Sequence, residues 1–224
     1  MVIAILVIWA HAASATELQD RLASGEILVS CNDVSGSKAK QGEARGVVDA
    51  PPAEVWRVIT EVDHFQEFMP RTLKSQTVAP EQLKEVLNAR PTSASQVEGI
   101  LGPKSANSQA DRTSGRQWVV YLYSLLDFPW PVQSRWYIIK ISNDETQAEN
   151  HRYLSSWSLQ IGNLKENRGE WRLESFGDHK TLVTYQLISD PEVSLPAFLV
   201  KRGTSITLPQ VIASVRQRVA QLSP

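Results

Sequence analysis

Five segments rich in β-branched and aromatic residues follow one another in the second half of the chain, and one amphipathic segment closes it. The five cover residues 117–126, 135–142, 151–161, 169–175 and 181–188. Turn-forming residues separate them, so we expect consecutive strands of an antiparallel meander. In the closing segment, apolar residues recur every three or four positions, which predicts one buried helix face: Leu208, Val211, Ile212, Val215, Val219 and Leu222. We expect Pro209 in the first turn of this helix, behind Thr207 as a candidate cap.

The first half of the chain mixes shorter strand and helix signals. Pro51 and Pro52 followed by Glu54 predict a helix start, because proline is tolerated in the first turn and an acidic side chain is favoured there. The other expected elements are a helical lead at 16–24, strands at 27–32, 42–49 and 73–79, a short helix at 62–69, one or two helical turns at 82–87, and a polar loop at 103–115. This order predicts the α+β class, with a sheet that buries one face under the closing helix.

Charge and cysteine content exclude several other classes. The chain has 23 Lys and Arg against 24 Asp and Glu, and this balance argues against a nucleic acid as the main partner. Its single cysteine can form no intrachain disulfide, and no set of Cys and His has the spacing of a structural zinc site. The fold must therefore rest on its apolar core.

The N-terminus has the pattern of a secretory signal peptide. Residues 2–10 are apolar and too few to span a membrane, and Ala13, Ser14 and Ala15 have the small-residue form of a cleavage site. No Lys or Arg precedes the apolar run, so a misassigned start or an uncleaved anchor stays open. We expect a signal peptide over 1–15, one domain over 16–224, and a periplasmic or secreted monomer.

Several short motifs, in this order, resemble the START-like family, which binds lipids in a helix-grip fold. They are DAPPAEVW at 49–56, VDHF at 62–65, FMP at 68–70, FPWPVQSRWY at 128–137, GEWRL at 169–173 and TLVTY at 181–185. The resemblance covers residues 27–222. The chain departs from the family pattern at Trp136, where an acidic residue is usual, and at Glu192 and Val193, which replace two glycines.

The resemblance implies a curved antiparallel sheet that wraps around the C-terminal helix and leaves a tunnel for one hydrophobic molecule. Family members bind or transfer lipids, sterols and polyketides, and some relatives cyclise aromatic polyketides. The expected partner is therefore a lipid or another hydrophobic small molecule, with transient contact to a membrane. The expected lid is a terminal helix or the loop at 127–132.

Strand alternation predicts which side chains face that space. In 135–142 we place Lys140 outward, so Arg135, Tyr137, Ile139 and Ile141 face inward. By the same argument, inward-facing residues are Trp157 and Ile161 in 151–161, Trp171 in 169–175, and Tyr185 in 181–188. Strand 117–126 is apolar on both faces, and we choose Tyr121 and Tyr123 only because their phenols could contact a ligand. The predicted ligand-binding residues are Tyr121, Tyr123, Arg135, Tyr137, Trp157, Trp171 and Tyr185, while Trp118 and Trp136 are expected on the outer face.

Arg135 has two interpretations. On an inward apolar face its charge must be paired. It could bind the carboxylate, phosphate or hydroxyl of a ligand head group, or it could form an ion pair with a neighbouring strand.

The sequence does not support catalysis. His64, His151 and His179 lack metal-ligand spacing, and there is no nucleophile elbow, phosphate-binding loop or Cys/His pair. We predict no catalytic residue, cofactor or metal. Three functions stay open: a carrier of a hydrophobic ligand, a polyketide cyclase or aromatase, and a protein-binding module with a filled core.

Overall fold

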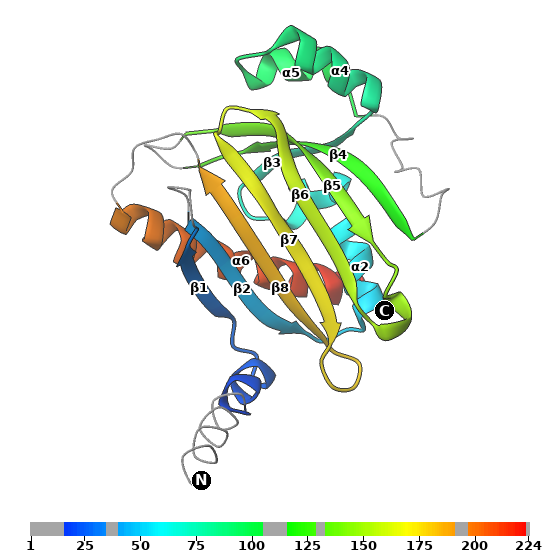
Figure 1. Ribbon diagram of the computed structural model, residues 1–224, viewed down its shortest axis with the longest axis vertical. Coiled ribbons are helices and arrows are strands. Elements are labelled where there is room, and N and C mark those ends of the chain that lie inside the picture. Colours follow the sequence, from blue (N-terminus) through cyan, green and yellow to red (C-terminus); the bar gives the residue numbers. More distant parts are fainter. Residues whose placement is uncertain (1–15, 35–39, 105–115, 129–132, 191–196, 223–224) are drawn as a thin grey trace, which may run out of the picture.

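A single antiparallel sheet of eight strands forms the body of the protein. The computed structural model describes residues 16–34, 40–104, 116–128, 133–190 and 197–222, with the backbone alone over 197–205. The strands are β1 (Leu28–Asp33), β2 (Lys40–Val48), β3 (Thr72–Val78), β4 (Gln117–Leu126), β5 (Arg135–Asp144), β6 (Tyr153–Gly162), β7 (Glu166–Ser175) and β8 (Thr181–Asp190). Their order in the sheet is β1-β2-β8-β7-β6-β5-β4-β3, so the first hairpin pairs with the last strand (Figure 1).

Helices α6 (Ala197–Leu222) and α2 (Pro52–Thr60) lie on one face of this sheet (Figure 1). The α6 helix packs on β1, β2 and β8, and α2 packs on β7 and on α6. Five of the six predicted stripe residues are buried against the sheet, whereas Leu222 is 53% exposed. The predicted α+β class and helix-grip fold are confirmed.

The closing helix begins earlier than the sequence suggested. It starts at Ala197, so Pro209 lies inside the helix and Thr207 does not cap it. An interior proline removes one backbone hydrogen bond and favours a kink. Leu208 and Val211 on either side of it are buried, and this packing compensates for the lost bond.

The first half of the chain agrees closely with expectation. Residues 16–23 are helical, Pro52 opens α2 with Glu54 in its first turn, and the short helical stretch consists of η1 (Val62–His64) and α3 (Phe65–Phe68). Another short helical turn, η2 (Ala148–Asn150), follows β5. The predicted signal peptide at 1–15 lies outside the described residues. No described helix has the length and apolar character needed to cross a membrane.

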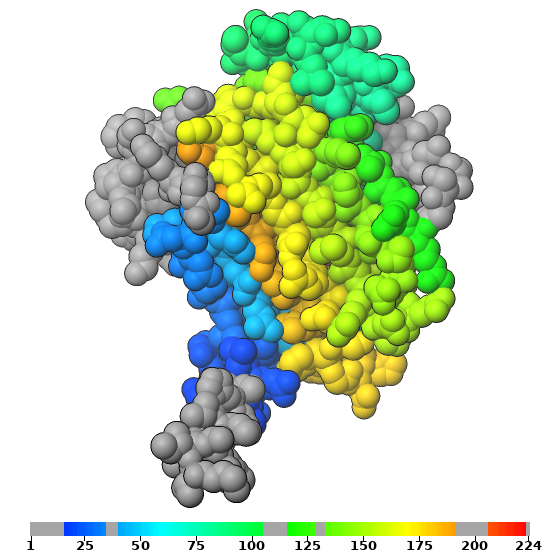
Figure 2. All heavy atoms as spheres, in the orientation of Figure 1, coloured from blue at the N-terminus to red at the C-terminus, as the bar shows by residue number. Residues whose placement is uncertain are grey.

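Two helices in the segment 80–116 form a separate layer on the opposite face of the sheet. They are α4 (Pro80–Ala89), longer than the predicted turns, and α5 (Ala94–Leu101), which was not predicted. They form a lobe at one end of the molecule (Figure 2). Their apolar side chains pack against β3, β4 and β5 in a second core cluster that includes Val78, Val86, Val97, Tyr123, Trp136 and Ile138. Most of the predicted loop at 103–115 lies outside the described residues.

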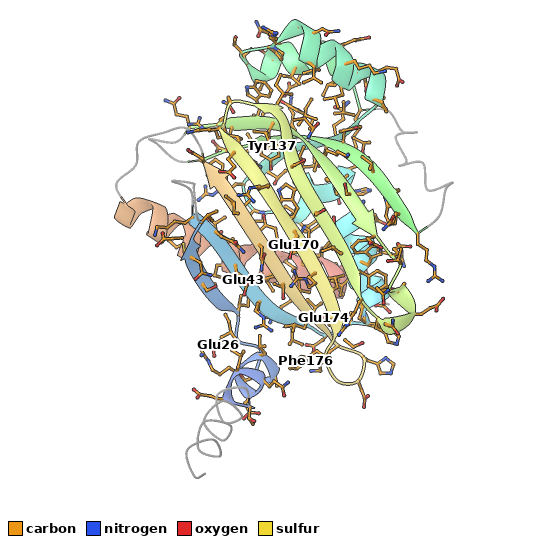
Figure 3. The ribbon with its side chains drawn as sticks, in the orientation of Figure 1. Glu26, Glu43, Tyr137, Glu170, Glu174 and Phe176 are labelled. Carbon is orange, nitrogen blue, oxygen red and sulfur yellow. The ribbon has the colours of Figure 1, made fainter. Side chains whose placement is uncertain are left out.

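The rest of that opposite face is polar. Gln186 donates from Nε2 to Oε2 of Glu43 at 2.6 Å, and Arg172 pairs with Glu170. Figure 3 labels Glu43, Glu170 and Glu174, which lie on this solvent-facing side. On strands β6, β7 and β8 most apolar side chains lie on the helix-facing side, whereas Leu154, Ile161, Leu182 and Ile188 lie on the opposite side.

Candidate functional site

The register of the sheet assembles two adjacent rows of side chains on the helix-facing side. One row crosses five strands with Trp118, Asn143, Ser155, Trp171 and Tyr185. The next row crosses them with Val120, Ile141, Trp157, Gly169 and Leu187. Aromatic, aliphatic and very small residues thus alternate across the same surface.

Aromatic rings contact one another across these rows. The ring centroids of Trp171 and Tyr185 are 4.4 Å apart, and those of Trp157 and Tyr185 are 5.5 Å apart in a stacked arrangement. Trp56 from α2 lies 5.1 Å from Tyr153 and 5.9 Å from Trp118. The indole nitrogen of Trp56 also donates to the carboxylate of Glu145. The helix-facing side therefore carries two groups of aromatic rings in one core cluster, which we call the aromatic surface.

Burial is uneven along this surface. Near α2 the side chains are closely packed: Trp118, Tyr153, Leu173 and Val183 are all at most 9% exposed. Further along, Tyr137, Trp157, Leu159 and Leu187 contact the same core but remain only partly buried. Figure 3 shows Tyr137 near the end of the sheet that carries α4 and α5. Apolar surface thus remains uncovered on the side of the sheet that faces α6.

The polar groups within this surface are neutral. Trp157 donates from Nε1 to Oδ1 of the buried Asn167 at 2.9 Å. Burial raises the pKa of the Tyr137 phenol, while interactions with Ser124 and Asn167 act in the opposite direction. Burial, with a smaller contribution from Tyr137, also raises the pKa of Tyr185. Both phenols therefore stay protonated at neutral pH and can donate hydrogen bonds.

Four of the seven predicted ligand-binding residues meet on this face. Tyr137, Trp157, Trp171 and Tyr185 all belong to the core cluster under α6 or pack against it. The prediction of their shared face is confirmed, but whether they contact a ligand stays a prediction.

Tyr121 and Tyr123 lie on the opposite face, and their inward placement was wrong. Tyr123 is 1% exposed in the cluster under α4 and α5, where its hydroxyl donates to Oε1 of Glu98 at 3.0 Å. Burial, followed by the Glu98 carboxylate, raises the pKa of Tyr123. Tyr121 packs against the same cluster. The physical reason is that α4 and α5 cover this face, so β4 is buried on both sides and alternation could not assign its faces.

Arg135 is the first residue of β5 and is partly exposed rather than buried. Its guanidinium donates from NH1 to the carbonyl oxygen of Ser134 at 3.1 Å. Arg135 lies two residues before Tyr137 and so shares its face, at the edge of the aromatic surface. Binding of a ligand head group and a structural ion pair both stay open for it.

The sheet faces of Trp118, Trp136 and Ile161 agree only in part with the sequence-based prediction. Trp118 lies on the helix-facing side, not on the outer face, since it packs in the core cluster with Trp56. Trp136 is on the outer face as predicted, although α4 and α5 bury it. A bulge between Ile138 and Ile139 brings Ile161 into pairing with Ile138, and this turns Ile161 outward, against expectation.

Sequence reasoning missed Asn143, Asn167 and Gly169 on the helix-facing side. Asn143 follows Ile141 by two positions, so alternation extended to the end of β5 would have found it. Asn167 was missed because the strand was started at residue 169, whereas β7 begins at Glu166. Gly169 makes room for the ring of Trp157, and only three-dimensional packing shows that.

The histidines form no catalytic or metal-binding group in the part of the chain that the structure describes. His64 contacts Oε1 of Glu67 through Nδ1 at 2.6 Å, and His179 lies in an exposed turn with a φ of 54°. No cluster of three His, Cys, Asp or Glu side chains among the described residues could hold a metal ion. The aromatic surface itself offers apolar contact and the neutral hydrogen-bonding groups of Trp157, Tyr137 and Tyr185.

Comparison with known proteins identifies one family model and one curated relative. The family described as polyketide cyclase/dehydrase and lipid transport matches residues 48–216. An uncharacterised protein of Pseudomonas aeruginosa is 33% identical over 86 residues, which are 35% of this chain and 43% of that protein. The match therefore spans less than half of that relative.

Solved structures share the fold at low sequence identity. The STAR-related lipid transfer protein of Xanthomonas axonopodis aligns with a TM-score of 0.61 and 17% identity, over 87% of this chain and 94% of that one. Human StAR-related lipid transfer protein 5 aligns with a TM-score of 0.55 and 13% identity, over 97% and 98%. A START superfamily protein of Mycobacterium smegmatis gives 0.53 and 14%, over 82% and 99%. These likenesses support the fold alone.

Proposed function

Because the chain belongs to the polyketide cyclase/dehydrase and lipid transport family, we propose that it binds one hydrophobic molecule or lipid between the sheet and α6. The START-like resemblance of the sequence agrees with this membership, and family and fold together support a hydrophobic ligand. The observation that carries the proposal is the partly uncovered apolar surface of Tyr137, Trp157, Leu159 and Leu187, on the side that faces α6.

The aromatic character of this surface suits a bound molecule. Each large ring offers about 150–250 Å² of contact and has a polar edge that can hydrogen-bond. Burial of apolar area is favourable by about 25 cal/mol per Å², so a ligand that covers part of Trp157 and Tyr137 gains several kcal/mol before the entropic loss on binding. The two phenols and the Asn167 amide would orient such a ligand.

Delivery of the ligand forms the second part of the proposal. We propose that a signal peptide over residues 1–15 directs the protein to the periplasm or the exterior. There it would act as a monomer that contacts a membrane transiently to load or release its ligand. Movement of α6 would open the site, while the other expected lid, the loop at 127–132, lies mostly outside the described residues.

A polyketide cyclase or aromatase is the alternative function. The protonated phenols of Tyr137 and Tyr185 could polarise a ketone of such a substrate. Cyclisation also needs a group that accepts a proton. The described side chains in the two central rows include no carboxylate and no imidazole, and this favours carriage over catalysis.

Native mass spectrometry of gently purified protein tests the proposal. A carrier retains a hydrophobic molecule whose mass is the same before and after incubation, whereas a cyclase changes the mass of its ligand. Adding the recovered molecule back to stripped protein should raise its Tm, because binding to the folded state alone raises stability by about 2.7 kcal/mol at 100 times Kd. If no molecule co-purifies and no lipid of a broad panel raises the Tm, the proposal is wrong.

A further inference from the structure

Asn143 presents a buried amide that has no hydrogen-bond partner among the described residues. Its side chain is 3% exposed, and neither Nδ2 nor Oδ1 has a partner in the part of the chain that the structure describes. Buried amides in native proteins are nearly always hydrogen-bonded, so an amide with both ends unpartnered requires an explanation.

The position of Asn143 relates it to the aromatic surface. It lies on the helix-facing side, between Trp118 of β4 and Ser155 of β6. Two residues earlier, Ile141 pairs with Trp157, whose ring is only partly buried. The amide is therefore next to the row that keeps uncovered apolar surface, at the closely packed end of the site.

Asn167 is the natural comparison, because it is a buried asparagine on the same face. It is 7% exposed, and its Oδ1 accepts the Trp157 indole N–H at 2.9 Å. Within the described part of the chain, the fold thus provides a partner for the Asn167 amide and none for the Asn143 amide.

We propose that Asn143 is the polar anchor of the ligand site and binds a neutral hydroxyl or carbonyl group at the buried end of the ligand. This inference rests on the proposed function and specifies its ligand class. An amide both donates and accepts, so it suits either group.

A charged ligand end does not fit this position. The described side chains of the Asn143 row and of the neighbouring Trp157 row are uncharged. A carboxylate or phosphate beside Asn143 would be desolvated with no opposite charge in either row, which is strongly unfavourable. The buried Asn143 end of the site should therefore prefer an uncharged polar group.

The first test compares the stability of Asn143→Leu and Asn167→Leu in the full chain without ligand. Leucine has nearly the shape of asparagine, and replacing an unpartnered buried amide by an apolar group is neutral or stabilising. We expect the Tm of Asn143→Leu to stay level or rise by about 2–4 °C, and that of Asn167→Leu to fall by at least as much, because the Trp157 N–H loses its acceptor. A clear drop for Asn143→Leu would overturn the proposal, since the amide would then have a partner in the empty protein.

The second test measures selectivity by calorimetry with three probes of one shape: 2-naphthol, naphthalene and 2-naphthoate. Wild-type protein should bind 2-naphthol about 10-fold more tightly than naphthalene, which corresponds to one hydrogen bond of about 1.4 kcal/mol. It should bind the anionic 2-naphthoate most weakly. In Asn143→Leu the preference for 2-naphthol should disappear, while the affinity for naphthalene should be kept or increased.

The outcomes separate this inference from the function on which it rests. Suppose that naphthalene binds. If wild-type protein binds 2-naphthol no more tightly than naphthalene, or if Asn143→Leu still binds 2-naphthol more tightly, Asn143 is not the anchor and the hydrophobic site stands. Equal affinity for 2-naphthoate and 2-naphthol would contradict the expected preference for an uncharged polar group. If no probe binds and no lipid co-purifies, the proposed function fails and the anchor fails with it.

Discussion

Gly169 of β7 lies directly beneath the indole of Trp157 on β6. A Cβ atom at residue 169 would be 2.8 Å from Cη2 of Trp157 and closer still to Cζ2, and it would also meet the carbonyl oxygen of Gln186. The missing side chain of Gly169 therefore determines where the Trp157 ring can lie.

Gly169→Ala should displace this ring and destabilise the fold. Overpacking of this kind reduces the free energy of unfolding by about 1–3 kcal/mol, which urea denaturation can measure. Gly99→Ala is the matched control, because a Cβ at Gly99 in α5 has no atom within 4 Å. This control should gain about 0.5–1 kcal/mol, since alanine is the better helix former. Equal stability of Gly169→Ala and wild type would contradict the packing described.

The same change, tyrosine to phenylalanine, tests the two faces of the sheet when it is made at Tyr137 and at Tyr121. Tyr137 lies on the helix-facing side and Tyr121 on the opposite side. Removing the hydroxyl of Tyr137 should weaken binding of the co-purified ligand by about 3- to 10-fold, the effect of one lost hydrogen bond. Tyr121→Phe should leave the Kd unchanged. Titration calorimetry measures both, and an effect at Tyr121 alone would place the ligand on the wrong side of the sheet for our proposal.

Alkaline pH should unfold the protein through its buried tyrosines. Burial raises the pKa of Tyr123, Tyr137, Tyr153 and Tyr185, while an unfolded phenol ionises near pH 10. Above about pH 10 the unfolded chain thus binds fewer protons than the folded one, and the free energy of unfolding falls as the pH rises. Below that pH the contribution is fully present.

Phenolate absorbance and circular dichroism, followed together, check this prediction. We expect most of the phenolate signal to appear only as the dichroism of the sheet is lost. Tyr185→Phe should make the decline of stability with pH less steep. Four tyrosines that ionise near pH 10 in an intact fold would contradict the burial reported above.

Glu67 should hold the C-terminal part of α6 against α3. Its carboxylate contacts His64 and accepts from NH2 of Arg218 at 2.8 Å, and Arg218 also lies 5.6 Å from the centroid of the Phe68 ring. The hydrogen bond with His64 is the main cause that lowers the pKa of Glu67, and Arg218 adds to it. A lowered pKa gives stability that is present above about pH 4.3 and lost as the pH falls through the folded-state pKa.

Glu67→Gln should therefore reduce the free energy of unfolding at pH 7 by about 0.2–1 kcal/mol, as expected for a solvent-screened pair. At a pH low enough to protonate Glu67 in the folded state as well, the difference from wild type should vanish. Amide exchange in the last turns of α6 should accelerate in Glu67→Gln. Glu149→Gln, which breaks an exposed pair with Arg116 away from α6, should leave that exchange unchanged. Equal protection of α6 in both variants would contradict the link between α3 and α6.

Strand positions were predictable where only one face is buried. For β7 and β8, polar residues on the outer face contrast with apolar residues on the inner face, and alternation placed Trp171 and Tyr185 correctly. The same reasoning failed on β4, because α4 and α5 cover its second face where it carries Tyr121, Tyr123 and Leu125, so both faces of the strand are largely apolar. Tyr121, Tyr123 and Trp118 were therefore assigned to the wrong sides.

The candidate site was predictable only in part, because packing and register complete it. The bulge at Ile138 and Ile139 reverses the face of Ile161, and no local residue pattern reveals it. The amides of Asn143 and Asn167 look alike in sequence, yet among the residues that the structure describes only Asn167 has a partner. That difference depends on which side chains come within hydrogen-bond distance of each amide in the folded sheet.

The pairing of β2 with β8 also governs when the binding surface can form. Gln41 and Gln186, which are hydrogen-bonded at 2.9 Å, are 145 residues apart in the chain. Closing so long a loop is entropically unfavourable, and folds with many such distant contacts fold slowly. Since β8 supplies Tyr185 and Leu187 and α6 follows it, a nascent chain still lacking its last segment has no complete aromatic surface. On the proposed function, a ligand can therefore bind only after β8 and α6 have been synthesised.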